Sequence, residues 1–135
     1  MSRFDNKVAL VTGGGTGIGR AIAEALVAEG ARVVVTGRRE EPLKQLASKH
    51  PDTVRYVTTD VTEKGAPAAA VRFVIEQFDH LDVLVNNAGV GVLAPLVDLD
   101  DEALQQISGV NVQGVLICTR EAIPHLARNG GAVVN

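Results

Sequence analysis

The sequence has 135 residues, of which 46% are hydrophobic and 21% are charged, and its formal net charge is -3 at pH 7. This length corresponds to one domain, and the composition excludes an intrinsically disordered chain. The mildly acidic balance argues against a nucleic-acid partner, which would need a basic surface.

Short β-branched runs alternate with longer stretches along the whole chain. Each run is nearly all apolar, as expected for strands of a parallel sheet that helices cover on both faces. The predicted strands span residues 8–12, 32–36, 54–58, 82–86 and 132–135. Because crossover connections are right-handed, this order predicts an open, doubly wound α/β sheet whose ligands bind at the carboxyl ends of its strands.

The stretches between these strands have apolar residues at helical spacing. The first helix is predicted at residues 18–29, since Gly30 favours a helix end just before it. The second helix is predicted at residues 40–49, with acids and a proline in its first turn. A third helix opens at Thr62 and runs to about residue 78.

Residues 99–128 predict a short helix and then a longer one, divided near residues 108–109. Pro124 lies inside the longer helix and should kink it. The chain contains no repeat, linker or low-complexity segment. We therefore expect residues 1–135 to form a single domain.

A glycine-rich turn joins the first predicted strand to the first predicted helix. It reads Thr12-Gly13-Gly14-Gly15-Thr16-Gly17-Ile18-Gly19. Glycines let the backbone approach a pyrophosphate, and the free N–H groups and dipole of the helix favour its negative charge. The run fits T-G-x-x-x-G-x-G and lacks the Lys of a nucleoside-triphosphate loop. A plain glycine-rich turn is the alternative.

Residues 12–19 resemble the cofactor loop of the short-chain dehydrogenases/reductases, which are NAD(P)-dependent oxidoreductases with a Rossmann-type sheet. Asn86-Asn87-Ala88-Gly89 is similar to the N-N-A-G segment of that family. The first and fourth strands should be neighbours at the switch point, so both segments would flank one cofactor crevice. The resemblance implies that the asparagines stabilise the central strands while Ala88 and Gly89 lie beside the cofactor ribose.

Asp60, Val61 and Thr62 resemble the D-V-T segment of the family, in which the acid lies by the adenine ring. An alternative role for Asp60 is an N-cap or an Asx-turn, because it stands just ahead of the third predicted helix.

The residues after the second predicted strand bear on the choice between NAD and NADP. A turn that binds NAD usually has an acid about 20 residues past the glycines, whereas an Arg there accommodates the 2′-phosphate of NADP. This chain has Gly37 and then Arg38 at that point. Arg38 and Arg39 also precede a helix start, where a positive charge calls for an anion. Glu40 and Glu41 are alternative partners, but we expect NADP in preference to NAD.

The expected cofactor-binding residues come from four segments that follow predicted strands. They are Thr12, Gly13, Gly15, Thr16, Gly17, Ile18, Gly19, Arg38, Asp60, Val61, Asn87, Ala88 and Gly89. Thr16 departs from the pattern, since many relatives that prefer NADP have a basic residue there.

In this family a Tyr acts as the general acid/base of hydride transfer, a Lys four residues later lowers its pKa, a Ser orients the carbonyl and an Asn holds a water. Asn111 matches that Asn, as the one expected catalytic residue. Its alternative role, fixing the helix to a neighbour by hydrogen bonds, describes it better, because the Tyr, Lys and Ser are missing. The only Tyr, Tyr56, falls in the third predicted strand, with Asp60 four residues later.

Residues 130–135 resemble the run that leads to the catalytic Ser of the family. We therefore expect the cofactor-binding half of an NAD(P)-dependent oxidoreductase, truncated before the later strands and inactive by itself. The alternative is a catalytically silent NAD(P)-binding or interaction module. A methyltransferase that binds S-adenosylmethionine fits less well, because its glycine turn lacks this spacing.

The single Cys118 cannot close an intrachain disulfide, and no cluster has zinc-ligand spacing. No apolar run approaches the ~18 residues of a membrane span or forms a signal peptide. We expect a cytoplasmic protein with a small alcohol or carbonyl substrate and no metal, nucleic-acid or membrane partner. The helix near residues 110–128 resembles one that pairs subunits in the family, so we expect a homo-oligomer, and an unpaired fifth strand would add to association.

Overall fold

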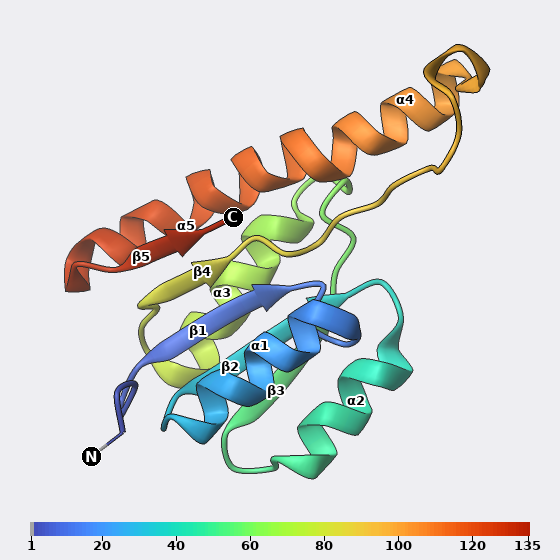
Figure 1. Cartoon of the computed structure of the whole chain (residues 1–135). Coiled ribbons are helices and arrows are strands. Elements are labelled where there is room, and N and C mark those ends of the chain that lie inside the picture. Colours follow the sequence, from blue (N-terminus) through green and yellow to red (C-terminus); the bar gives the residue numbers. More distant parts are fainter. Residues whose placement is uncertain (1) are drawn as a thin grey trace.

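Five parallel strands form the sheet of the computed structural model, which describes residues 2–135 (Figure 1). They are β1 (Val8–Thr12), β2 (Arg32–Gly37), β3 (Val54–Thr58), β4 (Val83–Val85) and β5 (Ala132–Val134). Their order across the sheet is β3-β2-β1-β4-β5, and all four pairings are parallel. The order reverses between β1 and β4, which confirms the predicted doubly wound sheet and its switch point.

Two layers of helices cover the sheet (Figure 1). The first layer holds α1 (Gly17–Ala28) and α2 (Glu40–Lys49), and the second holds α3 (Ala66–Phe78) and α5 (Val115–Asn129). The connection from β4 to α5 contains η1 (Leu96–Asp98), α4 (Asp101–Ser108) and η2 (Gly109–Gly114). In Figure 1, α4 extends beyond the end of the sheet.

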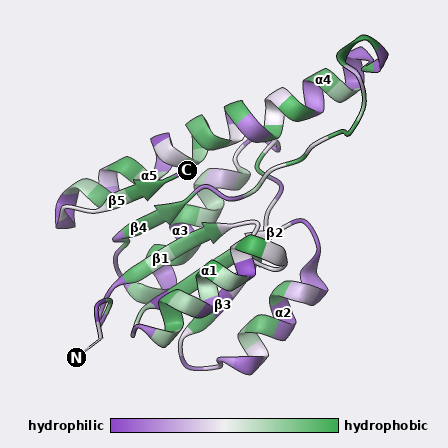
Figure 2. Ribbon diagram, in the orientation of Figure 1, coloured by the Kyte–Doolittle hydropathy of each residue, from purple (hydrophilic) through white to green (hydrophobic). Residues whose placement is uncertain are grey.

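Each central strand contributes to two cores because its side chains alternate between the two faces. Ala9 and Val11 pack on the side of α1 and α2, whereas Val8 and Leu10 pack on the side of α3 and α5. All four are at most 1% exposed. Figure 2 shows the resulting apolar strands between helices of mixed hydropathy. At about 1.5–3 kcal/mol for each buried aliphatic side chain, this burial is the main force that holds the sheet and helices together.

The helices differ from the sequence predictions at two places. α3 begins at Ala66 instead of Thr62, because Gly65 adopts a left-handed conformation with φ 80° and Pro67 occupies the first helical turn. The division expected near residues 108–109 is a π-helix, η2, through which α4 continues into α5 without a break in the helical path. The kink expected at Pro124 stays a prediction.

None of the helices within residues 2–135 has the length and hydropathy needed to cross a membrane.

Candidate cofactor-binding site

The turn between β1 and α1 depends on glycine for its backbone conformation. Gly13 has φ 65° and Gly17 has φ 54°, in the left-handed region that strains residues with a Cβ atom. A Cβ on Gly17 would meet no atom within 4 Å, so only the backbone conformation requires glycine there. The N–H of Gly14 donates to the carbonyl of Thr36, 3.0 Å away, which joins the turn to the end of β2.

Other glycines of the turn are required because the chain packs tightly around them. A Cβ on Gly19 would collide with the carbonyl group of Gly13, and a Cβ on Gly14 would lie 2.6 Å from Cγ1 of Val35. α1 therefore begins directly against the ends of β1 and β2. Its first turn has no acidic residue and Thr16 makes no side-chain cap, which leaves the helix start suited to an anion.

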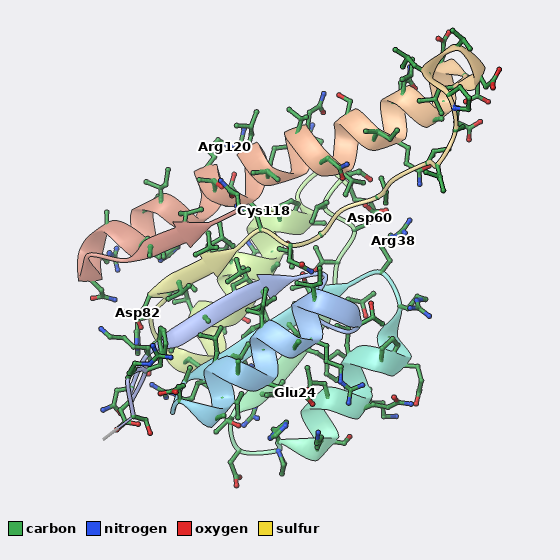
Figure 3. All side chains as sticks on the ribbon, in the orientation of Figure 1. Glu24, Arg38, Asp60, Asp82, Cys118 and Arg120 are labelled. Carbon is green, nitrogen blue, oxygen red and sulfur yellow. The ribbon has the colours of Figure 1, made fainter. Side chains whose placement is uncertain are left out.

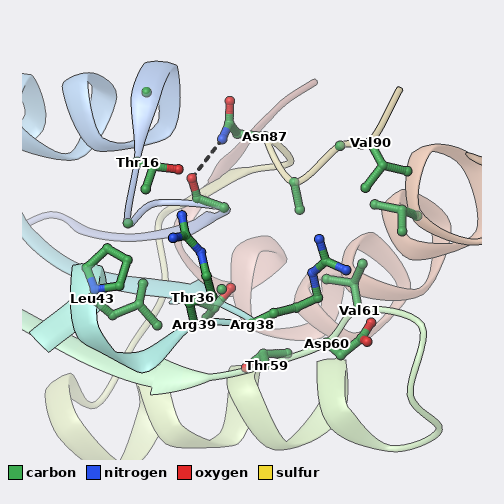
Figure 4. A pocket seen from close by; sticks show the side chains of 18 of the residues that line it. Thr16, Thr36, Arg38, Arg39, Leu43, Thr59, Asp60, Val61, Asn87 and Val90 are labelled. Carbon is green, nitrogen blue, oxygen red and sulfur yellow. Dashed lines mark hydrogen bonds between the residues drawn. The ribbon is translucent and has the colours of Figure 1, made fainter. Parts of the chain in front are cut away.

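Thr12 fixes the segment after β4 against the end of β1. Its Oγ1 accepts hydrogen bonds from the N–H groups of Asn87, at 3.1 Å, and Ala88, at 3.0 Å. In return, Nδ2 of Asn87 donates to the carbonyl of Gly13 at 3.0 Å, the bond drawn in Figure 4. The two segments that face each other at the switch point are therefore joined by three hydrogen bonds.

Asn86 links β4 to elements on its other side. Its Nδ2 donates to Oγ1 of Thr119 at 3.0 Å and to Oδ1 of Asn135 at 2.8 Å. Its backbone N–H donates to the carbonyl of Val134 at 2.8 Å. Asn86 thus connects β4 to α5 and to the end of β5, and Asn87 connects the segment after β4 to the end of β1, in line with the strand-stabilising role that the family resemblance implied.

A cavity of about 670 Å³ opens at the carboxyl ends of β1 to β4 (Figure 4). Its lining includes all the expected cofactor-binding residues except Thr12 and Gly19, which lie behind the turn and support it. The full lining is Gly13, Gly15, Thr16, Gly17, Ile18, Thr36, Gly37, Arg38, Arg39, Pro42, Leu43, Thr59, Asp60, Val61, Asn87, Ala88, Gly89, Val90 and Val110.

Several lining residues were not expected from the sequence. Pro42 and Leu43 come from the apolar face of α2, and Val90 and Val110 come from the loop after β4 and from η2. The signal for Leu43 was present, since it belongs to the apolar side of a helix that follows β2. Val110 had no such signal, because only the path of η2 brings it to the cavity.

Asp60 forms an Asx-turn at the edge of the cavity. Its Oδ1 accepts hydrogen bonds from Oγ1 of Thr62, at 2.6 Å, and from the N–H of Thr62, at 2.9 Å. These bonds, with a smaller contribution from the Arg38 guanidinium, hold the pKa of Asp60 below its ordinary value against the opposing effect of burial. Asp60 is therefore a carboxylate at neutral pH, and the Asx-turn alternative is the geometry observed.

Arg38, labelled in Figure 3, and Arg39 extend from the end of β2 to the cavity (Figure 4). Both side chains are exposed. Among residues 2–135, no carboxylate lies within 4.0 Å of either guanidinium and neither forms a hydrogen bond. Both guanidiniums are consequently available to an anion, which Arg recognises through paired N–H groups.

Asn111 lies in η2, and both polar atoms of its side-chain amide form hydrogen bonds with the same residue, Val90. Its Oδ1 accepts from the N–H of Val90 at 2.9 Å, and its Nδ2 donates to the carbonyl of Val90 at 2.7 Å. The side chain does not line the cavity. This geometry matches the fixing role, with the loop after β4 as the partner.

Tyr56 and Cys118 lie away from the cavity. Oη of Tyr56 donates to Oε1 of Glu40 at 3.0 Å, and this bond, together with burial, raises the pKa of the phenol. Burial raises the pKa of the Cys118 thiol to about 11, which agrees with a core role. No group of three metal-ligating side chains occurs in the part of the chain that the structure describes.

The family profile described as short chain dehydrogenase matches residues 7–135. The chain belongs to this family. Its fold is similar to that of a crystal structure of a short-chain dehydrogenase from Streptomyces avermitilis, with a TM-score of 0.89 and 38% identity. That likeness covers 96% of this chain and 49% of the other.

Relatives of this chain include named enzymes. It is 37% identical over 134 residues to meso-2,3-butanediol dehydrogenase of Serratia marcescens, covering 98% of this chain and 53% of the relative. It is 41% identical over 137 residues to cis-1,2-dihydrobenzene-1,2-diol dehydrogenase of Pseudomonas putida. This match covers 98% of this chain and 50% of the relative. The chain therefore spans about half the length of the curated relatives it matches.

Proposed function

We propose that this chain supplies the cofactor-binding half of an NAD(P)-dependent oxidoreductase that transfers hydride between a nicotinamide and an alcohol or carbonyl carbon. The observation that carries the proposal is the pairing of the glycine turn with residues 87–89 across the cavity of about 670 Å³. Rossmann-type sheets bind dinucleotides at this switch point.

The residues present fit a dinucleotide. The backbone N–H groups of residues 15–18 would bind the diphosphate, because α1 starts there without an acid. Asp60 and Val61 would lie by the adenine, and Ala88 and Gly89 by a ribose. Bound there, the nicotinamide would supply the hydride chemistry. The chain itself contributes binding and orientation.

NADP is the cofactor we propose in preference to NAD. The end of β2 has Gly37 where an acid would bind the ribose 2′-hydroxyl, and Arg38 follows at the cavity. Arg38 and Arg39 would hold the 2′-phosphate, since no carboxylate of residues 2–135 pairs with them. Calorimetric titration of the folded chain with NADPH and NADH tests both statements. If neither NADPH nor NADH gives a measurable heat of binding, the proposed site is contradicted.

For the 135 residues by themselves we propose a second function, that of a catalytically silent NAD(P)-binding or interaction module. One observation favours it. The cavity lining contains no Tyr or Lys, and the single Tyr is bonded to Glu40 outside it. An assay of NADPH oxidation with mixed ketones separates the two functions. Turnover by this chain alone would refute the expectation that it is inactive.

We also propose a cytoplasmic location and a small alcohol or carbonyl substrate. The location is supported by the lone, buried Cys118, which suits a reducing compartment. The loop after the N-N-A-G segment offers apolar side chains, with Val92 46% and Leu93 107% exposed, and these would form one wall of a substrate pocket. Pairing of two copies through residues 110–128 is supported by Leu116 and Ile123, which are 64% and 51% exposed.

A further inference from the structure

Three carboxylates stand near Arg38 and Arg39 in sequence or in space, and none of them pairs with either guanidinium. Glu40 and Glu41 follow directly as the first residues of α2, and Asp60 lies beside Arg38 at the cavity (Figure 4). A carboxylate so close would ordinarily compete with a bound phosphate for the guanidiniums. Something must therefore hold these acids elsewhere.

Each acid accepts its hydrogen bonds from a neutral donor. Asp60 takes both of its bonds from Thr62, and Oε1 of Glu41 lies 3.5 Å from Nε2 of Gln45. Oε1 of Glu40 accepts from Oη of Tyr56 at 3.0 Å. The bonds to Asp60 and Glu41 come from residues two and four positions away, whereas Tyr56 reaches Glu40 from another element of the fold.

We infer that Tyr56 is a positioning residue for cofactor choice, because its hydroxyl holds the Glu40 carboxylate away from Arg38 and Arg39 and so keeps both guanidiniums free for a phosphate monoester. The phosphate in question is the 2′-phosphate of NADP, so the inference rests on the proposed function. It deepens that function by naming a residue outside the cavity that sets the preference for NADP over NAD.

The packing around Tyr56 fixes the direction in which its hydroxyl points toward Glu40. Tyr56 lies in β3 opposite Val35 of β2, and its half-buried ring packs against the core below α1 and α2. The ring is therefore fixed while its hydroxyl reaches the start of α2. The pKa of the phenol is raised by Glu40 and by burial, so Tyr56 keeps its proton and donates at neutral pH.

The cavity lining is consistent with this separation of charges. Arg38 and Arg39 line the cavity, whereas Glu40 and Glu41 do not. Glu40 also stays out of the second hollow of about 460 Å³ outside the glycine turn, which Glu41 lines together with Arg39, Arg20 and Gln45. Without the Tyr56 hydroxyl, the Glu40 carboxylate would lose its partner and could swing to the neighbouring guanidiniums, where it would repel a phosphate.

The test is a double-mutant cycle with Tyr56→Phe and Glu40→Gln, read out as the dissociation constants of NADPH and NADH by calorimetry. Tyr56→Phe preserves the ring and its packing, and its folding is checked by circular dichroism. We expect Tyr56→Phe to weaken NADPH binding about three- to fivefold, the size of one nearby charge in a solvated site, and to leave NADH binding unchanged. In the Glu40→Gln background the same change should have no effect.

Glu41→Gln is the matched control, because it removes the adjacent charge that Tyr56 does not touch. The effect of Tyr56→Phe should persist in that background. An equal loss of NADPH and NADH affinity, or an effect that survives Glu40→Gln, would overturn the inference and assign Tyr56 a structural role only. An unchanged dissociation constant of NADPH in Tyr56→Phe would overturn the inference as well, but it would not contradict the proposed cofactor site. Failure of the unmodified chain to bind NADPH would overturn the proposed site and this inference together.

Discussion

The side-chain amide of Asn111 forms two hydrogen bonds with the backbone of Val90: its Oδ1 accepts from the N–H at 2.9 Å, and its Nδ2 donates to the carbonyl at 2.7 Å. One side chain of the π-helix thus holds the loop that leaves β4. Because Val90 and Gly89 line the cavity, this pair determines where one wall of the site lies. The residue that the family pattern associates with catalysis is, in this chain, first of all a link between a helix and a loop.

The first prediction concerns this link. Asn111→Ala removes both hydrogen bonds and should lower the free energy of unfolding by about 1–2 kcal/mol, since each such bond contributes about 0.5–1.5 kcal/mol net. Urea denaturation followed by circular dichroism measures the change. Gln113→Ala is the control, because Gln113 is exposed in the same π-helix and forms none of the side-chain bonds found. Equal stability of the two variants would contradict the linking role.

The second prediction concerns the packing of the glycine turn. A Cβ at residue 19 would collide with the Gly13 carbonyl, so Gly19→Ala must move α1 away from β1. We expect a loss of stability of about 1–3 kcal/mol, as for other overpacked sites, and a loss of cofactor binding. Gly91→Ala provides the comparison, because a Cβ there would meet no atom within 4 Å. The measurements are thermal unfolding and NADPH titration, and wild-type affinity in Gly19→Ala would count against the assignment of the turn.

The third prediction concerns cofactor preference. Arg38→Asp replaces a cation at the cavity by an acid of the kind that binds the ribose 2′-hydroxyl. The ratio of NADPH to NADH affinity should fall by about tenfold or more, because an attraction to the 2′-phosphate becomes a repulsion. Arg72→Asp makes the same charge change on the outer surface of α3 and should leave the ratio unaltered. An unchanged ratio in Arg38→Asp would remove Arg38 from the site.

The fourth prediction concerns acid pH. The bonds from Thr62 lower the pKa of Asp60 below its ordinary value of 3.8, so the folded chain binds this proton less readily than the unfolded chain. Asp60 therefore contributes to stability above about pH 4, and the contribution is lost as the pH falls through the lowered pKa. The stability difference between wild type and Asp60→Ala should shrink between pH 5 and pH 2, as measured by urea denaturation. A constant difference over that range would show that the charge of Asp60 plays no part.

Local motifs explain why so much of the site could be predicted from the sequence. The glycine turn and the N-N-A-G segment each follow a strand directly, so their place at the switch point follows from the strand order alone. The central strands β1 and β2 were predictable because both of their faces are buried and their residues are almost all apolar.

The parts that could not be predicted depend on contacts between distant segments. The bond between Tyr56 and Glu40 joins residues 16 positions apart on different elements, and Val110 reaches the cavity only through the course of η2. The start of α3 was misplaced because the left-handed Gly65 and the turn at Asp60 both precede the helix. In each case the sequence contains the residue but not the geometry that decides its role.

The last prediction concerns the free edge of the sheet. β5 pairs only with β4 among the described strands, and Val133 and Val134 are 38% and 52% exposed. An apolar edge with unpaired backbone groups favours association, so we expect the 135-residue chain to form oligomers in light scattering. Val134→Lys puts a charge on this edge and should shift the distribution toward the monomer, whereas Leu116→Lys on α5 would act only if pairing runs through the helix. A stable monomer at high concentration in the unmodified chain would refute both routes of association.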